Sequence, residues 1–293
     1  MIDYIKLSSR LNATEMADLR NKIDFFESIN GSTGEPEKIL ANGKKASYRS
    51  TAWIKNIKLD LFPKGYIELA GSLHKYYNDG KHNYNQFGIK EAEIALKQLI
   101  EVTRLQLPCY KVRSVEVGVN LTPPIPSDDI INNALMYKRK PFEAKHRNDE
   151  GNYNQVKLYE YLVKLYNKRL HYEIQGYDIG HEILRFELKI NKMRVLAKYK
   201  VFTLEDLMNN IEDIAKDLLP KAWEEVILYD PTMNKQTKEQ TIKYANVNFW
   251  RGIAKKRSYN YHHRKLYRLM EGNTCAIQAQ VKDVMLDTLD CLV

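Results

Sequence analysis

The stretch Arg113-Ser114-Val115-Glu116-Val117-Gly118-Val119-Asn120-Leu121 alternates between apolar and polar residues. Successive side chains of a β-strand point to opposite faces of a sheet, so this alternation predicts a strand with one apolar and one polar face. Glu116 lies on the polar face. The stretch Glu182–Ile190 alternates in the same way and places Glu187 on its polar face, between Arg185 and Lys189.

Two further stretches extend the predicted sheet. Polar residues share one face of residues 66–76 and one face of residues 161–166: Glu68, Ser72 and His74 in the first stretch, and Lys164 and Tyr166 in the second. If the four strands are neighbours, their polar faces form one continuous surface.

Helices are predicted on either side of these strands. Apolar residues recur at helical spacing in residues 16–29, 89–103 and 204–218, and Pro220 is expected to open a further helix. Strands interleaved with helices predict an α+β fold, with a mixed, mainly antiparallel sheet and helices packed on one of its faces.

The polar surface has two interpretations. Glu116 and Glu187 can share a divalent cation, Mg²⁺ or Mn²⁺, because hard cations prefer carboxylate oxygens, and His74 or Glu68 can complete the site. The other interpretation is the solvent-exposed face of a half-covered sheet, carrying surface salt bridges. Alternation by itself favours the second interpretation slightly.

Positive charge is concentrated near the end of the chain. The formal net charge of the 293 residues is +9. Residues 235–271 contain ten Lys and Arg against two Glu, so this helical stretch carries +8. A local basic surplus interleaved with aromatic residues suits a polyanion, although a solvated helix surface is the simpler alternative. We predict a catalytic domain over residues 1–231 and a basic helical DNA-binding segment over residues 232–293.

The residues expected to contact DNA are basic. They are Lys164 on the sheet and Arg251, Lys255, Lys256, Arg257, Arg264 and Lys265 in the basic segment. No apolar run approaches the roughly 20 residues of a membrane span, and the N-terminus has no signal-peptide pattern, so we expect no membrane association and a cytoplasmic location.

Four segments follow one another in the order seen in a known group of replication proteins. They are Gly71–Tyr76, Val115–Asn120, Leu165–Lys168 and Leu184–Lys189, and the stretch Tyr199–Leu207 fits the same pattern. In this order they resemble the filamentous-phage replication protein group and the related replication initiation factor family of rolling-circle plasmids. The resemblance spans residues 1–207.

The resemblance implies a metal-dependent endonuclease that nicks and rejoins one DNA strand at an origin. The tyrosine of a Tyr-x-Lys block, here Tyr166 with Lys168, would be the nucleophile, and Tyr161 or Tyr159 would replace it if the strand register differed. Two positions depart from the family pattern, because Asn167 and Asn120 stand where aspartates are common.

The implied partners are origin DNA, single-stranded or extruded at the nick site, and the helicase and polymerase of a bacterial host. Two other classes fit the same sequence: a non-catalytic origin-binding or repressor protein, and an RNA-binding module. Metal-dependent nicking of supercoiled plasmid separates the first class from both of them.

Overall fold

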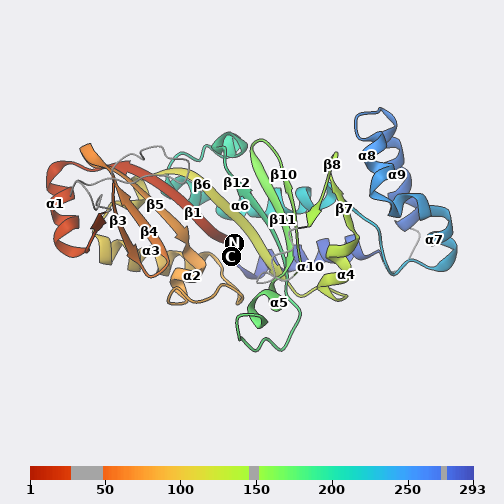
Figure 1. Cartoon of the computed structure of the whole chain (residues 1–293), viewed down its shortest axis with the longest axis horizontal. Helices are drawn as coiled ribbons and strands as arrows, with labels where there is room; N and C mark the ends of the chain where they lie inside the picture. The colour runs from red at the N-terminus through yellow and green to blue at the C-terminus, as the bar shows by residue number, and fades with distance from the viewer. Residues whose placement is uncertain (28–48, 145–151, 272–275) are drawn as a thin grey trace, which may run out of the picture.

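The computed structural model describes residues 1–27, 49–144, 152–271 and 276–293. Within them, ten strands form one sheet in the order β2-β3-β4-β5-β1-β6-β12-β11-β10-β9, and every pairing is antiparallel. The strands are β1 (Ile2–Arg10), β2 (Phe26–Glu27), β3 (Ser50–Ile54), β4 (Ile57–Leu61), β5 (Tyr66–Ser72), β6 (Lys111–Leu121), β9 (Glu143–Ala144), β10 (Tyr153–Lys157), β11 (Tyr161–Asn167) and β12 (Leu184–Ile190). The predicted α+β class is confirmed (Figure 1).

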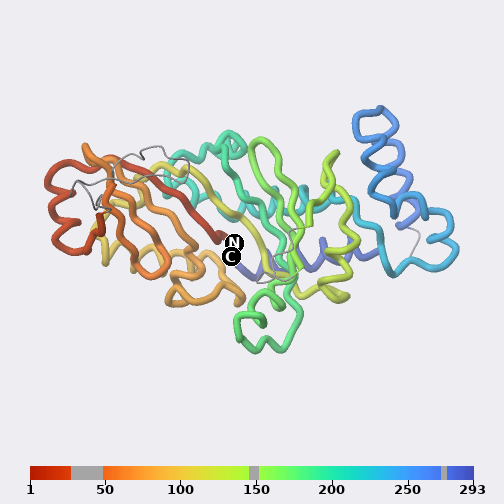
Figure 2. Tube along the Cα trace, in the orientation of Figure 1, coloured from red at the N-terminus to blue at the C-terminus, as the bar shows by residue number. Residues whose placement is uncertain are grey.

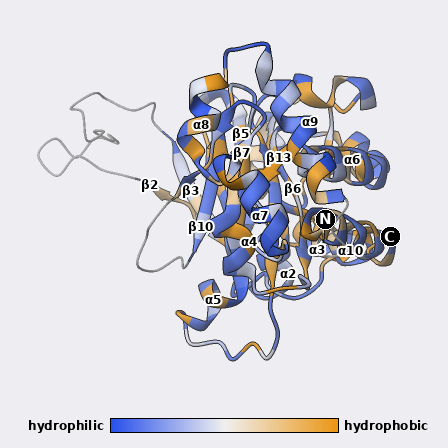
Figure 3. Cartoon of the chain, turned by 90° about the vertical axis from the view of Figure 1, so that its right-hand side faces the viewer, coloured by the Kyte–Doolittle hydropathy of each residue, from blue (hydrophilic) through white to orange (hydrophobic). Residues whose placement is uncertain are grey.

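The helices that surround the sheet are α1 (Ala13–Lys22), α2 (Leu73–Tyr77), α3 (Ile89–Thr103), α4 (Ser127–Asn133), α5 (Lys168–Glu173), α6 (Leu204–Glu224) and α10 (Ile277–Cys291). Short 3-10 turns lie at Pro63–Gly65, Leu107–Cys109, Met193–Tyr199 and Ile242–Ala245. The long helices α3, α6 and α10 lie together on one side of the sheet (Figure 3). Their buried residues pack in one core with the apolar faces of β6 and β12.

The helix expected over residues 204–218 begins at a capping box. The Thr203 hydroxyl accepts a hydrogen bond from the Asp206 amide, and the Asp206 carboxylate accepts one from the Thr203 amide. The prediction that Pro220 opens a separate helix is wrong, because α6 runs through Pro220 to Glu224. Leu219, Pro220 and Trp223 are buried there, so packing of this turn outweighs the amide hydrogen bond that proline cannot donate.

The predicted strand over residues 66–76 is shorter than expected. β5 ends at Ser72, whose hydroxyl accepts a hydrogen bond from the Lys75 amide at 3.0 Å and so caps α2. The expectation that His74 lies on a strand face with Glu68 is therefore wrong. His74 lies in the first turn of α2 instead.

The basic stretch is helical, as predicted, and forms α7 (Lys235–Thr241), α8 (Val247–Ile253) and α9 (Ser258–Glu271). Residues of α8 and α9 pack in a second hydrophobic cluster with residues of β7 (Ala134–Tyr137) and β13 (Val226–Leu228), and these two strands form a three-stranded sheet with β8 (Lys140–Pro141). Figure 2 shows α7–α9 at the opposite end of the molecule from α1. The division near residue 232 stays a prediction, and α10, which follows it, packs in the main core.

No helix among the described residues is both long enough and apolar enough to span a membrane.

Candidate functional site

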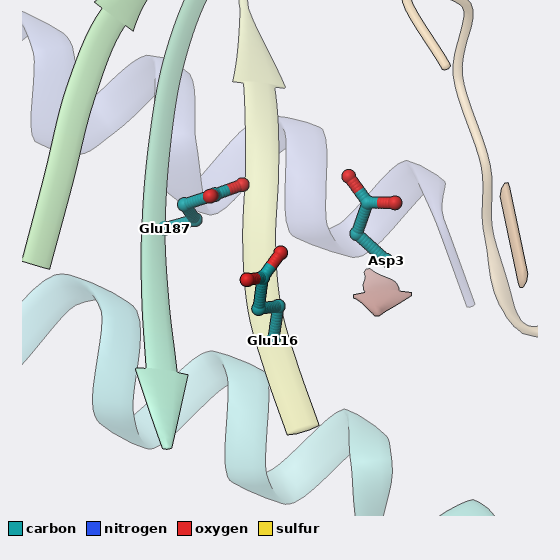
Figure 4. A group of neighbouring side chains, drawn as sticks. All are labelled: Asp3, Glu116 and Glu187. Carbon is teal, nitrogen blue, oxygen red and sulfur yellow. The ribbon is translucent and has the colours of Figure 1, made fainter. Parts of the chain in front are cut away.

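Three buried carboxylates meet on the polar face of the sheet. Asp3 on β1, Glu116 on β6 and Glu187 on β12 each offer an oxygen, and these oxygens lie within 4.8 Å of one another. The three strands are consecutive in the sheet, and Figure 4 shows the side chains gathered at one place. Between 2% and 7% of each residue is exposed, so this is not the solvent face of a half-covered sheet.

Asp3 was not predicted, and the reason is a register shift. Ile5 and Leu7 are buried on the apolar face, so regular alternation along β1 would place Asp3 with them. The pairing of β1 with β6 slips between Ile2 and Ile5. This irregularity allows the Asp3 carboxylate to reach the side of the sheet that carries Glu116.

Basic side chains neutralise the carboxylates. The Lys164 ammonium donates to Glu116 at 3.0 Å and to Glu187 at 2.6 Å, and Lys189 donates to Glu116 at 2.8 Å. Arg185 bridges Glu187 at 2.9 Å and Asp3 at 3.4 Å. The polar face therefore holds a compact network of alternating charge, partly covered by neighbouring loops.

The charges in this network shift each other's pKa. Burial raises the pKa of Glu187, but Lys164 and Arg185 outweigh it and lower the value to about 2. Burial also opposes ionisation of Asp3, yet Lys168 and Arg185 hold its pKa well below the usual range. Burial lowers the pKa of Lys164, but Glu187 and Glu116 raise it above its usual value. All three groups are thus charged at neutral pH.

Lys168 is the lysine of the Tyr-x-Lys block and is fully buried at the start of α5. Its ammonium donates to the Asn120 amide oxygen at 3.3 Å. Burial, reinforced by the positive charge of Arg185, lowers the pKa of Lys168 to about 7. The amine is therefore divided between its charged and neutral forms near neutral pH, and it can donate or accept a proton.

Asn120 and Asn167 make contacts that an aspartate would change. The Asn120 amide nitrogen donates to the carbonyls of Tyr84 and Asn85, both at 3.0 Å, and so ties the loop between α2 and α3 to the sheet. Asn167 caps α5 through the Leu170 amide and donates to Asp128 on α4. Asn167 lies on the same face of β11 as Val163 and Leu165, opposite to the face that carries Lys164 and Tyr166.

Tyr166 lies on the polar face. It pairs with Arg185 across β11 and β12, one step along the face from Lys164 and Glu187. Its side chain is half-buried, and its hydroxyl has no hydrogen-bond partner within the described part of the chain. Burial, and then the charge of Glu187, raise its pKa well above the ordinary value.

The two substitute tyrosines lie elsewhere. Tyr161 shares the apolar face of β11 with Val163, opposite to the face of Tyr166, and its hydroxyl is 3.0 Å from that of Tyr137. Tyr159 lies in the turn between β10 and β11 and is 78% exposed. Of the three, Tyr166 is the tyrosine beside the carboxylates.

His74 is buried but lies outside the carboxylate group. Its Nε2 atom is 2.7 Å from the Asn85 amide oxygen, and its ring stacks on Phe87 at 4.4 Å between centroids. Burial, and then the charge of Lys168, lower its pKa to about 3, so the ring is neutral at pH 7. Its role as a metal ligand stays a prediction.

The predicted DNA-contacting residues fall into two places. Six of them are exposed on α8, on α9 and on the turn between these helices: Arg251, Lys255, Lys256, Arg257, Arg264 and Lys265. The seventh, Lys164, lies apart from them, between two carboxylates of the sheet.

The donor set fits a hard divalent cation. Three carboxylates on neighbouring strands supply oxygen ligands at one point, which is the chemistry that Mg²⁺ and Mn²⁺ prefer. The Lys164 ammonium bridges two of these carboxylates, so it would have to give up at least one contact when a cation binds.

No family model and no curated protein matches the chain. Among solved structures, it is similar to a rolling circle replication initiator protein from Geobacillus stearothermophilus, with 11% sequence identity and a TM-score of 0.41, over 87% of this chain and 94% of that one. At that identity and TM-score, the likeness assigns no activity and no residue role to this chain.

Proposed function

We propose that this protein initiates rolling-circle DNA replication by nicking and rejoining one strand at an origin, with Tyr166 as the nucleophile. The observation that carries the proposal is the position of Tyr166 on the same side of the sheet as the carboxylates, directly opposite Arg185. A half-buried tyrosine whose hydroxyl has no partner among the described residues is available to react. Arg185 supplies positive charge beside it.

In the proposed step, the Tyr166 oxygen attacks the scissile phosphorus in line with its bond to the 3′ oxygen. The bond from tyrosine to phosphorus forms as the bond to the 3′ oxygen breaks. The phenol proton passes to solvent, and the departing 3′ oxygen takes a proton from water. The products are a 5′ phosphotyrosine and a free 3′ hydroxyl, and the reverse step rejoins the strand.

The residues around Tyr166 have distinct roles in this proposal. Asp3, Glu116 and Glu187 would hold Mg²⁺ or Mn²⁺, which supplies positive charge to the scissile phosphate. Lys164 contacts two of these carboxylates and holds them in place. Lys168, with a pKa of about 7, supplies a cation or a proton donor for a phosphate oxygen.

The free 3′ hydroxyl would prime a polymerase of the bacterial host, working with a host helicase in the cytoplasm. The strand that reaches Tyr166 would be single-stranded or extruded, since a nucleophile on a sheet must approach the backbone in line.

A non-catalytic origin-binding protein is the second candidate. The Lys164 ammonium already neutralises two of the carboxylates, and the raised pKa of Tyr166 disfavours the phenolate. Both observations fit a face that only stabilises the fold.

The test is to incubate the protein with supercoiled DNA of its own replicon, with and without Mg²⁺ or Mn²⁺. We expect a nicked product that carries covalently bound protein only when the cation is present. Tyr161→Phe is the matched control, because Tyr161 is on the same strand and points to the other face. DNA that is bound but never nicked would favour the non-catalytic alternative.

A further inference from the structure

The helices α8 and α9 are joined by a four-residue turn, Ala254-Lys255-Lys256-Arg257. One side of α9 is buried in the second hydrophobic cluster through Tyr259, Leu266 and Met270. The other side is exposed along the whole helix. Its residues recur at helical spacing and are Asn260, Tyr261, Arg264, Lys265 and Arg268.

A hairpin from another part of the chain lies beside this pair of helices. β7 and β8 are joined by Lys138 and Arg139, with Lys140 at the first position of β8, and all three side chains are exposed. The Arg139 guanidinium donates to the Ala254 carbonyl at 2.7 Å and to the Asn260 side chain at 3.3 Å. It also lies 4.9 Å from the ring centroid of Tyr259.

Arg139 therefore fixes the hairpin against the turn and the start of α9. Its partners are more than 100 residues away in sequence, so the basic surface is built by the fold from two separate segments. Because the Arg139 guanidinium is occupied by these contacts, the remaining positive charges of the hairpin are those of Lys138 and Lys140. Their ammonium groups reach the Tyr161 hydroxyl and the Lys157 carbonyl, both at the surface.

We propose that α9 lies in the major groove of duplex DNA and that the β7–β8 hairpin contacts the phosphate backbone beside it. The inference rests on the proposed function and deepens it, because it names the part of the protein that would hold origin duplex while the sheet acts on a single strand. A helix of 14 residues is about 21 Å long, enough to cross a major groove about 12 Å wide.

The chemistry of the exposed face favours a duplex over a single strand. Arginine and asparagine side chains can pair with base edges in the major groove, and lysines neutralise phosphates. Single-strand binding without sequence preference relies on several exposed aromatic rings that stack on bases. The outer face of α9 has one such ring, Tyr261, which is 62% exposed.

The experiment measures fluorescence anisotropy of a labelled duplex that carries the replicon's origin, over a range of KCl concentrations. The variants are Lys138→Gln and Lys140→Gln in the hairpin and Arg264→Gln and Arg268→Gln on α9. Lys97→Gln is the control, because Lys97 is an exposed lysine of α3, at the other end of the molecule (Figure 1). Melting temperatures of all variants establish that each is folded.

Each hairpin or α9 variant is expected to weaken binding and to make the slope of log affinity against log salt shallower by about one. Methylation of guanine N7, which lies in the major groove, is expected to block binding of the unmodified protein. Hairpin variants with the slope of Lys97→Gln would overturn the role of the hairpin, and full binding to methylated duplex would overturn the placement of α9.

The binding assay contains no divalent cation and requires no cleavage. A failure of nicking by Tyr166 would therefore leave its result unchanged. A failure of duplex binding would leave cleavage of a single-stranded origin oligonucleotide by Tyr166 unaffected, and this cleavage is measured beside the supercoiled-DNA test.

Discussion

Lys164 and Glu187 face each other across the paired strands β11 and β12, and the lysine ammonium is 2.6 Å from the glutamate oxygen. The same ammonium contacts Glu116 at 3.0 Å. A single positive charge thus joins two of the three carboxylates that we propose as metal ligands, so a metal ion must compete with it.

Lys164→Gln is expected to bind Mn²⁺ more tightly than the unmodified protein. Removal of the ammonium leaves two carboxylates with less positive charge nearby, so we expect a gain of about tenfold, which corresponds to about 1.4 kcal/mol. Electron paramagnetic resonance of free Mn²⁺ measures the change. Lys189→Gln is the matched control, because Lys189 pairs with one of the three carboxylates, Glu116, and is more exposed. Weaker Mn²⁺ binding by Lys164→Gln would show that the lysine does not compete with the metal.

Glu116→Gln, Glu187→Gln and Asp3→Asn are each expected to abolish metal-dependent nicking. Each substitution replaces one negatively charged ligand with a neutral amide of similar shape, and hard cations bind amides more weakly than carboxylates. Mn²⁺ titration and plasmid nicking check the result, with duplex binding as the measure of an intact fold. Glu68→Gln, a substitution on β5, is the control. If Asp3→Asn alone kept normal metal affinity, the site would consist of the two glutamates.

Tyr166→Phe is expected to form no covalent adduct with DNA. The substitution removes the attacking oxygen and leaves the ring contact with Tyr153, whose centroid is 5.4 Å away. Binding to origin duplex should be unchanged, because α8 and α9 lie at a distance from this strand (Figure 1). Peptide mapping of the adduct from the unmodified protein should find the nucleotide on Tyr166. A nucleotide on Tyr161 or Tyr159 would refute the residue assignment and leave the reaction class standing.

Stability is expected to rise between pH 6 and pH 9 through Lys168. The pKa of this lysine falls from 10.5 to about 7 on folding, so above pH 7 the unfolded chain binds more protons than the folded protein. Raising the pH therefore favours the folded state, by about 2–3 kcal/mol over this range.

Denaturant unfolding at both pH values measures the effect, and Lys168→Met isolates it. The variant lacks the titrating amine, so its stability should change less between pH 6 and pH 9 than that of the unmodified protein. An equal change in both proteins would mean that Lys168 keeps an ordinary pKa in the folded state.

Local sequence patterns predicted much of the central sheet. The alternation around Glu116 and Glu187 predicts which side chains share a face of the strand, because this depends only on the two-residue period of the backbone. Three of the four predicted strands, β6, β12 and β11, are adjacent in the structure, whereas β1 separates the fourth, β5, from β6. The α6 start at Thr203 was also predictable, because capping is a contact between residues three apart.

The sequence by itself determined which side chains lie on the polar face of each regular strand, and with them Glu116, Glu187, Lys164 and Tyr166. The tertiary structure decided the rest. Asp3 joins the site because β1 slips in register against β6, and Pro220 remains inside α6 because its turn is buried. Arg139 meets α9 across more than 100 residues. These features depend on contacts between distant segments, and a local periodicity holds no information about which segments will pack together.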